Sequence, residues 1–192
     1  MLFRSSIEGP IWPLPARATG IPIWVAGRIK RAARRAAAYG EAFYASTPVR
    51  LDELEFLGDL YRQELERLGK DPTQGRVAAN RIMIVVESEE DVERVAEPYA
   101  SNVLRTYAGL GALRTPDEMR HSPDENLFEI FGEEIYLVGT PETVANGIRR
   151  YAKSGVTDLN FRVLGGRLPL EHARRSLSLF RDEVLPRLAG VR

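Results

Sequence analysis

The stretch IPIWVAGRIKRAARRAAAYGEAFYAS, residues 21–46, decides the fold. Its opening apolar run, which ends at Gly27, is typical of a parallel strand that is covered on both faces. Residues 28–39 then place alanine and isoleucine on one side of a helix and basic residues on the other. After Gly40, which we expect at the C′ position of that helix, residues 42–46 resume an extended apolar segment. The pattern predicts a strand, a helix and a second strand, which together make a βαβ unit.

The turn at Gly27 is a candidate site for an anion. A strand that runs into a helix leaves the first backbone N–H groups unpaired, and the positive end of the helix dipole points beyond the strand. Arg28 and Arg31, expected one helical turn apart, would add charge-assisted hydrogen bonds to a phosphate. The alternative interpretation is that these arginines form only a solvated helix face, because no motif such as GxGxxG or GxxxxGK[ST] is present.

The rest of the chain continues the alternation of strands and helices. Helical spacing predicts helices over residues 51–68 and 88–109, and a β-branched apolar run ending at Val86 predicts the clearest strand. Residues 112–134 lose the pattern, which predicts a loop with one short helical turn near residues 127–131. The four predicted strands, each followed by a helix, cover residues 21–26, 42–46, 77–87 and 157–164.

Two further helices frame the last of these strands. Thr140, Pro141 and Glu142 supply an N-cap, a proline at the first helical position and an acidic first turn, and Pro169 opens the closing helix. Within the strand itself apolar and polar residues alternate, so one side is expected to face a polar interior or a substrate. The polar residues of that side are Asp158, Asn160 and Arg162.

Composition excludes several classes of function. The 192 residues are 44% hydrophobic, which suffices for a buried core, as one domain or as part of a larger one. Basic and acidic residues number 27 each, so we expect no nucleic-acid partner and no membrane association. There is no cysteine, and His121 and His172 have no neighbours that suggest a triad or a metal site, so no metal is expected. Without a long apolar run or a signal-peptide pattern, we expect a cytoplasmic protein.

Several motifs, in order, resemble one known family. PIWVAG, followed by an alanine-rich helix that ends in AAYG and by a strand, is similar to the fifth strand and fifth helix of the luciferase-like monooxygenases. These are flavin- or deazaflavin (F420)-dependent (β/α)8 barrels. LVGTPETVANGIRRYAKSGVTDLNFRVL resembles the family's "vGtPe" helix and last barrel strand, and SLSLFRDEVLPRL resembles its closing helix. The resemblance covers nearly all of the chain.

The resemblance implies an oxidoreductase that carries out monooxygenation or hydride transfer on a small organic substrate, with FMN or F420 as cofactor. In the family, the turn and helix start after the fifth strand hold the cofactor phosphate. Carried over to this sequence, the cofactor-binding residues are Ala26, Gly27, Arg28, Arg31, Tyr44 and Ser46. Several relatives have Ser or Thr at the turn, so the arginines indicate either a different anion or side chains that face away from it. Tyr44 is equally compatible with a place in the core, and no catalytic residue is assigned.

The match begins at the family's fifth strand, so the expected fold is α/β, the C-terminal half of a TIM-type (β/α)8 barrel with four parallel strands and outer helices. Residues 1–20 are expected as an extended lead-in, and residues 21–192 as the half-barrel domain with an irregular insertion near residues 109–134. Open strand edges predict self-association or a partner that completes the barrel. Two functions stay open: a cofactor-dependent oxidoreductase, or a non-catalytic remnant or split-protein half that needs such a partner.

Four other residues receive structural interpretations. Trp24 and Phe43 are expected in the core. Glu87, at the end of the clearest strand, and Arg167 could face a site at the barrel mouth, where the chemistry of such barrels gathers. They are more simply assigned to the helix start and the turn that follow their strands.

Overall fold

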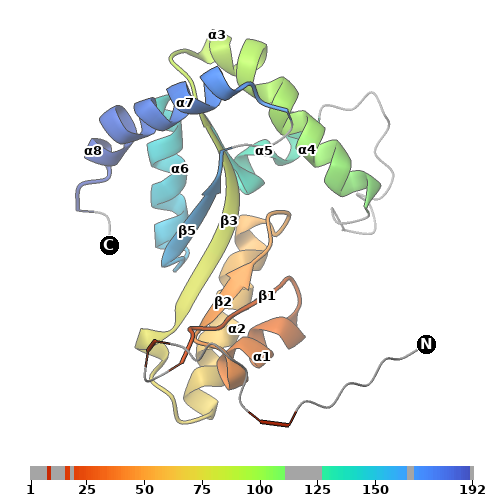
Figure 1. Ribbon diagram of the computed structural model, residues 1–192, viewed down its shortest axis with the longest axis vertical. Helices are drawn as coiled ribbons and strands as arrows, with labels where there is room; N and C mark the ends of the chain where they lie inside the picture. Colours follow the sequence, from red (N-terminus) through yellow and green to blue (C-terminus); the bar gives the residue numbers. More distant parts are fainter. Residues whose placement is uncertain (1–7, 10–15, 18–19, 111–126, 164–166, 191–192) are drawn as a thin grey trace.

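The computed structural model describes residues 8–9, 16–17, 20–110, 127–163 and 167–190, and it shows a parallel sheet surrounded by helices (Figure 1). The five strands are β1 (Trp24–Gly27), β2 (Ala42–Ala45), β3 (Arg76–Val85), β4 (Tyr136–Gly139) and β5 (Asp158–Arg162). The α-helices are α1 (Lys30–Tyr39), α2 (Leu51–Arg67), α3 (Glu89–Asp91), α4 (Glu97–Gly109), α5 (Leu127–Ile135), α6 (Pro141–Lys153), α7 (Leu170–Leu179) and α8 (Leu185–Arg187). A 3-10 helix, η1 (Pro72–Gln74), precedes β3, and the π-helical turns η2 (Val92–Ala96) and η4 (Phe180–Val184) precede α4 and follow α7.

The long strand β3 organises the sheet. β1 pairs with β2 and β2 with the first four residues of β3, while β4 pairs with the last four and β5 with the middle of the strand. Figure 1 shows β1, β2, α1 and α2 gathered around the start of β3, and α3, α4 and α7 around its end. Every pairing is parallel, and the four strands predicted from the sequence pair in sequence order. The predicted α/β half-barrel arrangement is therefore confirmed.

The segment before α6 differs from the prediction. Residues 127–135 form a helix of nine residues rather than a single turn in a loop, and the strand β4 follows it directly. β4 is only four residues long, too short for a period to show, and the sequence pattern misses it. The remainder of the predicted insertion, residues 111–126, lies outside the described residues.

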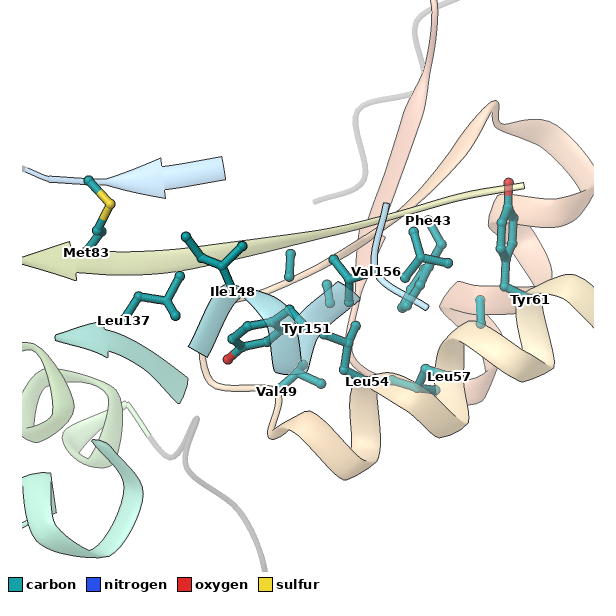
Figure 2. Packing of buried hydrophobic residues seen from close by; sticks show 14 of the residues in the cluster. Phe43, Val49, Leu54, Leu57, Tyr61, Met83, Leu137, Ile148, Tyr151 and Val156 are labelled. Carbon is teal, nitrogen blue, oxygen red and sulfur yellow. The ribbon is translucent and has the colours of Figure 1, made fainter. Parts of the chain in front are cut away.

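The helices α1, α2 and α6 cover one face of the sheet, which we call the outer face. Alternate strand residues such as Phe43 and Met83 point toward these helices, and Figure 2 shows Leu54 of α2 and Tyr151 of α6 on the same side of β3. Small residues let α1 lie close to the sheet, as predicted. Its fully or nearly fully buried residues are Ala32, Ala33, Ala36 and Ala37.

The inner face has a covered end and an open end. Toward the end of β3, Ile82 and Ile84 pack with Tyr136, with Leu104 of α4 and with Phe131 of α5 in a second core cluster. Toward the start of β3 no described helix supplies such a cluster on this face. The polar residues of β3 and β5 that lie on this face, such as Asn80 and Asn160, are therefore accessible from it, as expected of a barrel interior.

Trp24 corrects one prediction. We expected it in the core with Phe43, but Trp24 is 37% exposed whereas Phe43 is fully buried. The two residues lie on opposite faces of the sheet, because successive residues of a strand alternate and register places Trp24 beside Ala42 and Val25 beside Phe43. Among the described residues, only the outer face has helices that bury an aromatic side chain at that end.

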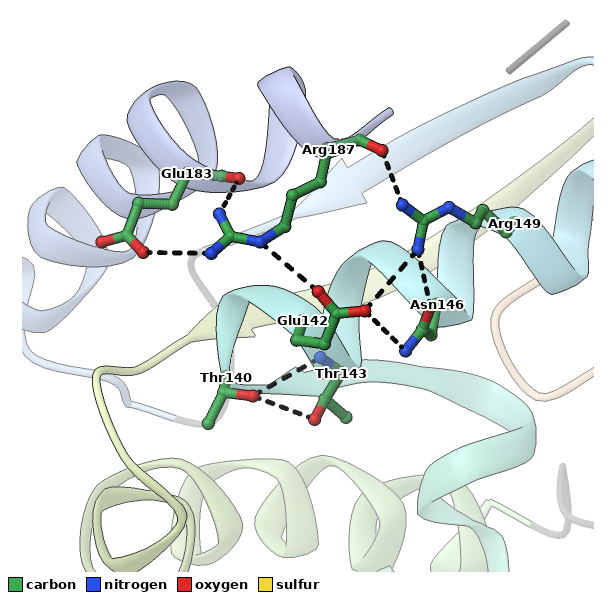
Figure 3. A network of polar contacts seen from close by, with 7 residues as sticks. All are labelled: Thr140, Glu142, Thr143, Asn146, Arg149, Glu183 and Arg187. Atoms are coloured by element: carbon green, nitrogen blue, oxygen red, sulfur yellow. Dashed lines mark hydrogen bonds and ion pairs between the residues drawn. The ribbon is translucent and has the colours of Figure 1, made fainter. Parts of the chain in front are cut away.

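A polar network ties the start of α6 to the C-terminal helix (Figure 3). As predicted, Thr140 is the N-cap, and its hydroxyl accepts a hydrogen bond from the Thr143 N–H at 3.4 Å. Glu142 in the first turn contacts Nε of Arg187 at 3.4 Å, and Arg149 donates to the Arg187 carbonyl at 2.6 Å. Such exposed pairs contribute little stability, so the network mainly sets where the last helix lies against α6.

Candidate functional site: the start of α1 and the inner face of the sheet

The start of α1 is held close to the end of β1. Gly27 ends the strand, and a Cβ at this position would lie 2.2 Å from the Cβ of Ala32. Only glycine allows the first turn of α1 to approach the strand so closely. The N–H of Ala32 donates to the carbonyl of Ile29 at 2.8 Å, which closes that first turn. The turn and the helix start are therefore a rigid unit at the C-terminal end of β1.

The N-terminus of α1 is electrostatically unusual. Ile29 is the N-cap residue and its side chain makes no capping hydrogen bond, and the first turn contains no acidic residue. Lys30 and Arg31 lie in that turn instead, with Arg28 two residues before the helix. Cations at the positive end of a helix dipole are destabilising, whereas an anion there is stabilised by the dipole and by the first N–H groups. The arrangement suits a bound anion better than it suits the free helix.

The predicted site residues fall into two groups. Gly27, Arg28 and Arg31 lie together at the start of α1, but α1 begins at Lys30, so Arg28 precedes the helix and does not belong to its first turn as predicted. The reason is that Ile29 is extended, with a φ of −132°. Ala26 and Tyr44 form the second group.

Ala26 and Tyr44 are neighbours on the inner face, where they pair in register across β1 and β2. Ser46 directly follows β2 and is partly buried. Gly40 closes α1, as predicted, but as the C-cap and in an extended conformation, not at C′ in the left-handed one.

Polar and aromatic side chains form a continuous layer on the open end of the inner face. The side-chain amide of Asn80 donates to the hydroxyl of Tyr44 at 2.9 Å and to Asn160 at 3.3 Å, and its oxygen accepts from Thr47 at 2.8 Å. The Tyr44 ring lies 6.1 Å from that of Trp24. Asn80 therefore fixes the Tyr44 phenol, and the layer joins β1, β2, β3 and β5.

An ion pair continues this layer toward the start of the strands. Nε of Arg76 donates to Asp158 at 3.0 Å, and the guanidinium carbon lies 4.8 Å from the centre of the Trp24 ring. The Arg76 guanidinium holds the pKa of the Asp158 carboxyl below its ordinary value, with Thr157 contributing in the same direction. The predicted alternation in the last strand is confirmed, since Asp158, Asn160 and Arg162 pair with alternate residues of β3 on this face.

A buried arginine supports the loop after β2 from behind. Arg81 is fully buried, and its guanidinium donates to the carbonyls of Thr47 at 3.2 Å and Val49 at 2.8 Å. Its Nε donates to the hydroxyl of Tyr151 at 2.6 Å, and that hydroxyl donates to the carbonyl of Glu134 at 2.9 Å. Hydrogen bonds from a buried charge are stronger than neutral ones, so this network holds the loop beside Tyr44 and Ser46 in place.

Several residues of the inner face were not predicted from the sequence, although one sequence pattern pointed to two polar residues of β3. Asn80 and Arg81 interrupt the run VAANRIMIVV, which is otherwise apolar, and two polar residues inside a buried strand need partners. Two other residues had no comparable signal, because they come from a loop and from a helix distant in sequence. They are Thr47 and Tyr107, whose hydroxyl accepts a hydrogen bond from Arg162 at 2.8 Å.

Glu87 and Arg167, which were assigned to the segments that follow their strands rather than to a site, behave as expected. Glu87 accepts a hydrogen bond from Nε of Arg175 at 2.5 Å and points to no site on the inner face. Arg167 is exposed and has a positive φ of 69°, as a turn residue. His172 borders a small cavity of about 90 Å³ beside Asp91 and Arg94. His121 lies outside the described residues.

A larger cavity, of about 600 Å³, lies between α5, β4 and α6. Both of its lining arginines are already engaged, since Arg149 donates to Asn146 at 2.6 Å and Arg150 donates to the carbonyl of Glu133 at 2.9 Å. In the described part of the chain, three or more His, Cys, Asp or Glu side chains never gather in a way that could hold a metal ion. Across the same residues, no helix has both the length and the apolar character needed to cross a membrane.

The fold and the site together define a class: a parallel α/β half-barrel with a basic strand-to-helix turn and a polar interior face. A family model described as luciferase-like monooxygenase matches residues 3–158. The chain therefore belongs to the luciferase-like monooxygenase family, as the sequence motifs predicted. No curated protein sequence matches the chain significantly.

Solved structures agree on the fold. The monooxygenase RslO1 from Streptomyces bottropensis is 21% identical, with a TM-score of 0.69 over 97% of this chain and 55% of its own. The coenzyme F420-dependent tetrahydromethanopterin reductase from Methanopyrus kandleri is 16% identical, with a TM-score of 0.62 over 86% of this chain and 50% of its own. The oxygenating constituent of 3,6-diketocamphane monooxygenase from Pseudomonas putida, in complex with FMN, is 18% identical, with a TM-score of 0.66 over 88% of this chain and 49% of its own. The chain thus spans about half the length of these structures.

Proposed function

We propose that this chain is the cofactor-phosphate half of a flavin- or F420-dependent oxidoreductase that acts on a small organic substrate. The observation that carries the proposal is the start of α1, where an uncapped helix N-terminus meets Arg28, Lys30 and Arg31 at the C-terminal end of a barrel strand. Family membership supports a phosphate-bearing cofactor, because one similar structure contains FMN and another is F420-dependent. The donor set fits such a phosphate: backbone N–H groups, a helix dipole and a guanidinium.

The proposed contacts follow from the geometry of the two groups of residues. The N–H groups of the first turn of α1 and the side chain of Arg31 would hold the phosphate, with Gly27 keeping the turn close. The inner face beside Ala26 and Tyr44 would receive the ring, where the Tyr44 phenol is already oriented by Asn80. The bound cofactor would supply the redox chemistry, and the residues of this chain bind and orient it.

We also propose that further barrel strands act together with this chain. In the described part of the chain, the strands β1, β4 and β5 each pair with one neighbour only, and apolar side chains near β1 are exposed, Ile21 at 70% and Ile23 at 58%. A second copy or a partner polypeptide with barrel strands would cover these edges. These open edges favour the hypothesis that the chain is a split-protein half that needs a partner for turnover. The proposed phosphate site would lie entirely on this chain.

The cofactor site is tested by titrating FMN and F420 into the purified chain and into two charge-reversal variants of α1. Arg31→Glu removes a charged hydrogen bond to the phosphate, worth about 1.5–3 kcal/mol, and should weaken binding by roughly 10- to 150-fold. Arg35→Glu makes the same change at an exposed position one turn further along the helix and should have little effect. Equal affinity in the wild type and in both variants would remove the assignment.

A further inference from the structure

Two buried polar atoms on the inner face have no hydrogen-bond partner in the part of the chain that the structure describes. They are the hydroxyl oxygen of Tyr136, a residue that is only 2% exposed, and Nε of Arg162. Buried polar atoms of native proteins are nearly always hydrogen-bonded, so each exception asks for an explanation. Both of these unpartnered atoms belong to residues that lie beside Ile82 of β3.

Strand pairing brings Tyr136 and Arg162 together. Both pair in register with Ile82, Tyr136 from β4 and Arg162 from β5. Residues in register on neighbouring strands point to the same face, so both side chains lie on the inner face next to Ile82. Tyr107 of α4 completes the group, because its hydroxyl accepts a hydrogen bond from Nη2 of Arg162 at 2.8 Å.

The Tyr136 phenol is a neutral donor in this environment. Burial raises the pKa of Tyr136 far above its ordinary value, and Tyr107 raises it further, whereas the nearby Arg162 guanidinium lowers it. The Tyr136 hydroxyl and the Nε–H of Arg162 are therefore two donors without an acceptor among the described residues.

Arg162 differs from the other arginines of β3 and β5. Arg76 is paired with Asp158, and the buried Arg81 donates to three carbonyls and a phenol. Among the described residues, Arg162 has no carboxylate within ion-pair distance, and its one hydrogen bond goes to a neutral hydroxyl. Its charge is therefore not balanced by the described part of the protein.

The group is reachable from the open end of the inner face. Arg162 and Tyr107 are partly exposed, and the Asn80–Asn160 pair lies one step back along the same face of the strands.

We infer that Arg162, Tyr136 and Tyr107 form a binding site for the carboxylate of a small organic acid. The carboxylate accepts hydrogen bonds from Nε of Arg162 and from the hydroxyl of Tyr136, while Tyr107 fixes the guanidinium. The site satisfies both unpartnered donors and balances the charge of Arg162. It lies on β4 and β5, apart from the start of α1, and it does not depend on a phosphate binding there.

Benzoate is a suitable probe, with benzyl alcohol as its uncharged counterpart, and binding is followed by NMR chemical-shift titration of the chain. Wild-type protein should bind benzoate saturably and benzyl alcohol far more weakly. Arg162→Gln and Tyr136→Phe should each raise the Kd for benzoate by about tenfold or more, the loss expected for a hydrogen bond to a charged group. Arg105→Gln and Tyr39→Phe, matched changes at exposed residues, should leave the Kd unchanged.

Two further measurements separate this site from a structural role and from the cofactor site. Tyr136→Phe removes a hydroxyl that has no partner among the described residues, so its Tm without benzoate should equal or exceed that of the wild type. Arg31→Glu should bind benzoate as the wild type does. The inference is overturned if the wild type shows no saturable benzoate binding, if both site variants keep the wild-type Kd, or if Tyr136→Phe lowers the Tm by several degrees.

Discussion

Gly27→Ala tests the close approach of α1 to β1, on which the proposed phosphate site depends. The added Cβ would lie 2.2 Å from the Cβ of Ala32, far inside normal contact distance, so α1 must move by more than an ångström. Overpacking of this kind costs about 1–3 kcal/mol. Alanine also reduces the conformational freedom of the unfolded chain, which raises the free energy of unfolding by about 0.4–1 kcal/mol. We therefore expect a net loss of up to about 2.6 kcal/mol in the free energy of unfolding.

Urea denaturation of the wild type, the two single variants Gly27→Ala and Ala32→Gly, and the double variant isolates the clash. Ala32→Gly removes the atom that the new Cβ meets, so the double variant Gly27→Ala/Ala32→Gly should be more stable than the sum of the two single changes predicts, by about 1–2 kcal/mol. Gly109→Ala is the matched control, because a Cβ there meets nothing within 4 Å. FMN affinity should fall in Gly27→Ala and recover in the double variant. A Gly27→Ala protein as stable as the wild type, with no coupling to Ala32, would refute the close-packing argument.

Three other outcomes are expected. Tyr151→Phe removes one hydrogen bond from Arg81 and one from the Glu134 carbonyl, so it should lower the free energy of unfolding by about 2–4 kcal/mol in urea denaturation. Tyr39→Phe, the same change at an exposed site, should not lower it. Equal stability of Tyr151→Phe and the wild type would contradict the network. Because the pKa of Asp158 is lowered, its pairing with Arg76 stabilises the protein above the ordinary aspartate pKa of about 4. This stabilisation, below about 1 kcal/mol for a partly exposed pair, is lost as the pH falls through the lowered pKa. Asp158→Asn should therefore flatten this part of the stability–pH profile, and an unchanged profile would argue against the pair. Sedimentation should show self-association that Ile23→Lys reduces, and a wild-type monomer at all concentrations would exclude open edges as an interface.

Local patterns in the sequence were sufficient for the elements around the candidate phosphate site. The apolar run before Gly27, the alanine face of the next helix and the Thr140–Pro141–Glu142 helix start all appear in the structure as predicted, because each depends on neighbours within a few residues. The family also followed from motifs quoted in order, and the family model confirms it. The start of α1 was misplaced by two residues, since the extended backbone at Ile29 leaves no signal in composition.

Tertiary structure alone decided which face each strand residue occupies and what covers it. Trp24 was expected in the core because it is aromatic, yet it lies on the inner face at an end that no described helix covers. The strand β4 was not visible in the sequence, because its four residues gain their hydrogen bonds from β3, about fifty positions earlier.

The group around Arg162 shows the same limit most clearly. Tyr136 and Arg162 are 26 residues apart and become neighbours only because β4 and β5 both pair with β3 at Ile82. Periodicity within one segment predicts which residues share a face of that segment, but it carries no information about which strands pair or in what register. The sequence by itself therefore predicted most of the elements, the family and a candidate anion site at Gly27, and the pairing of distant strands determined that the unpartnered donors lie on the same face.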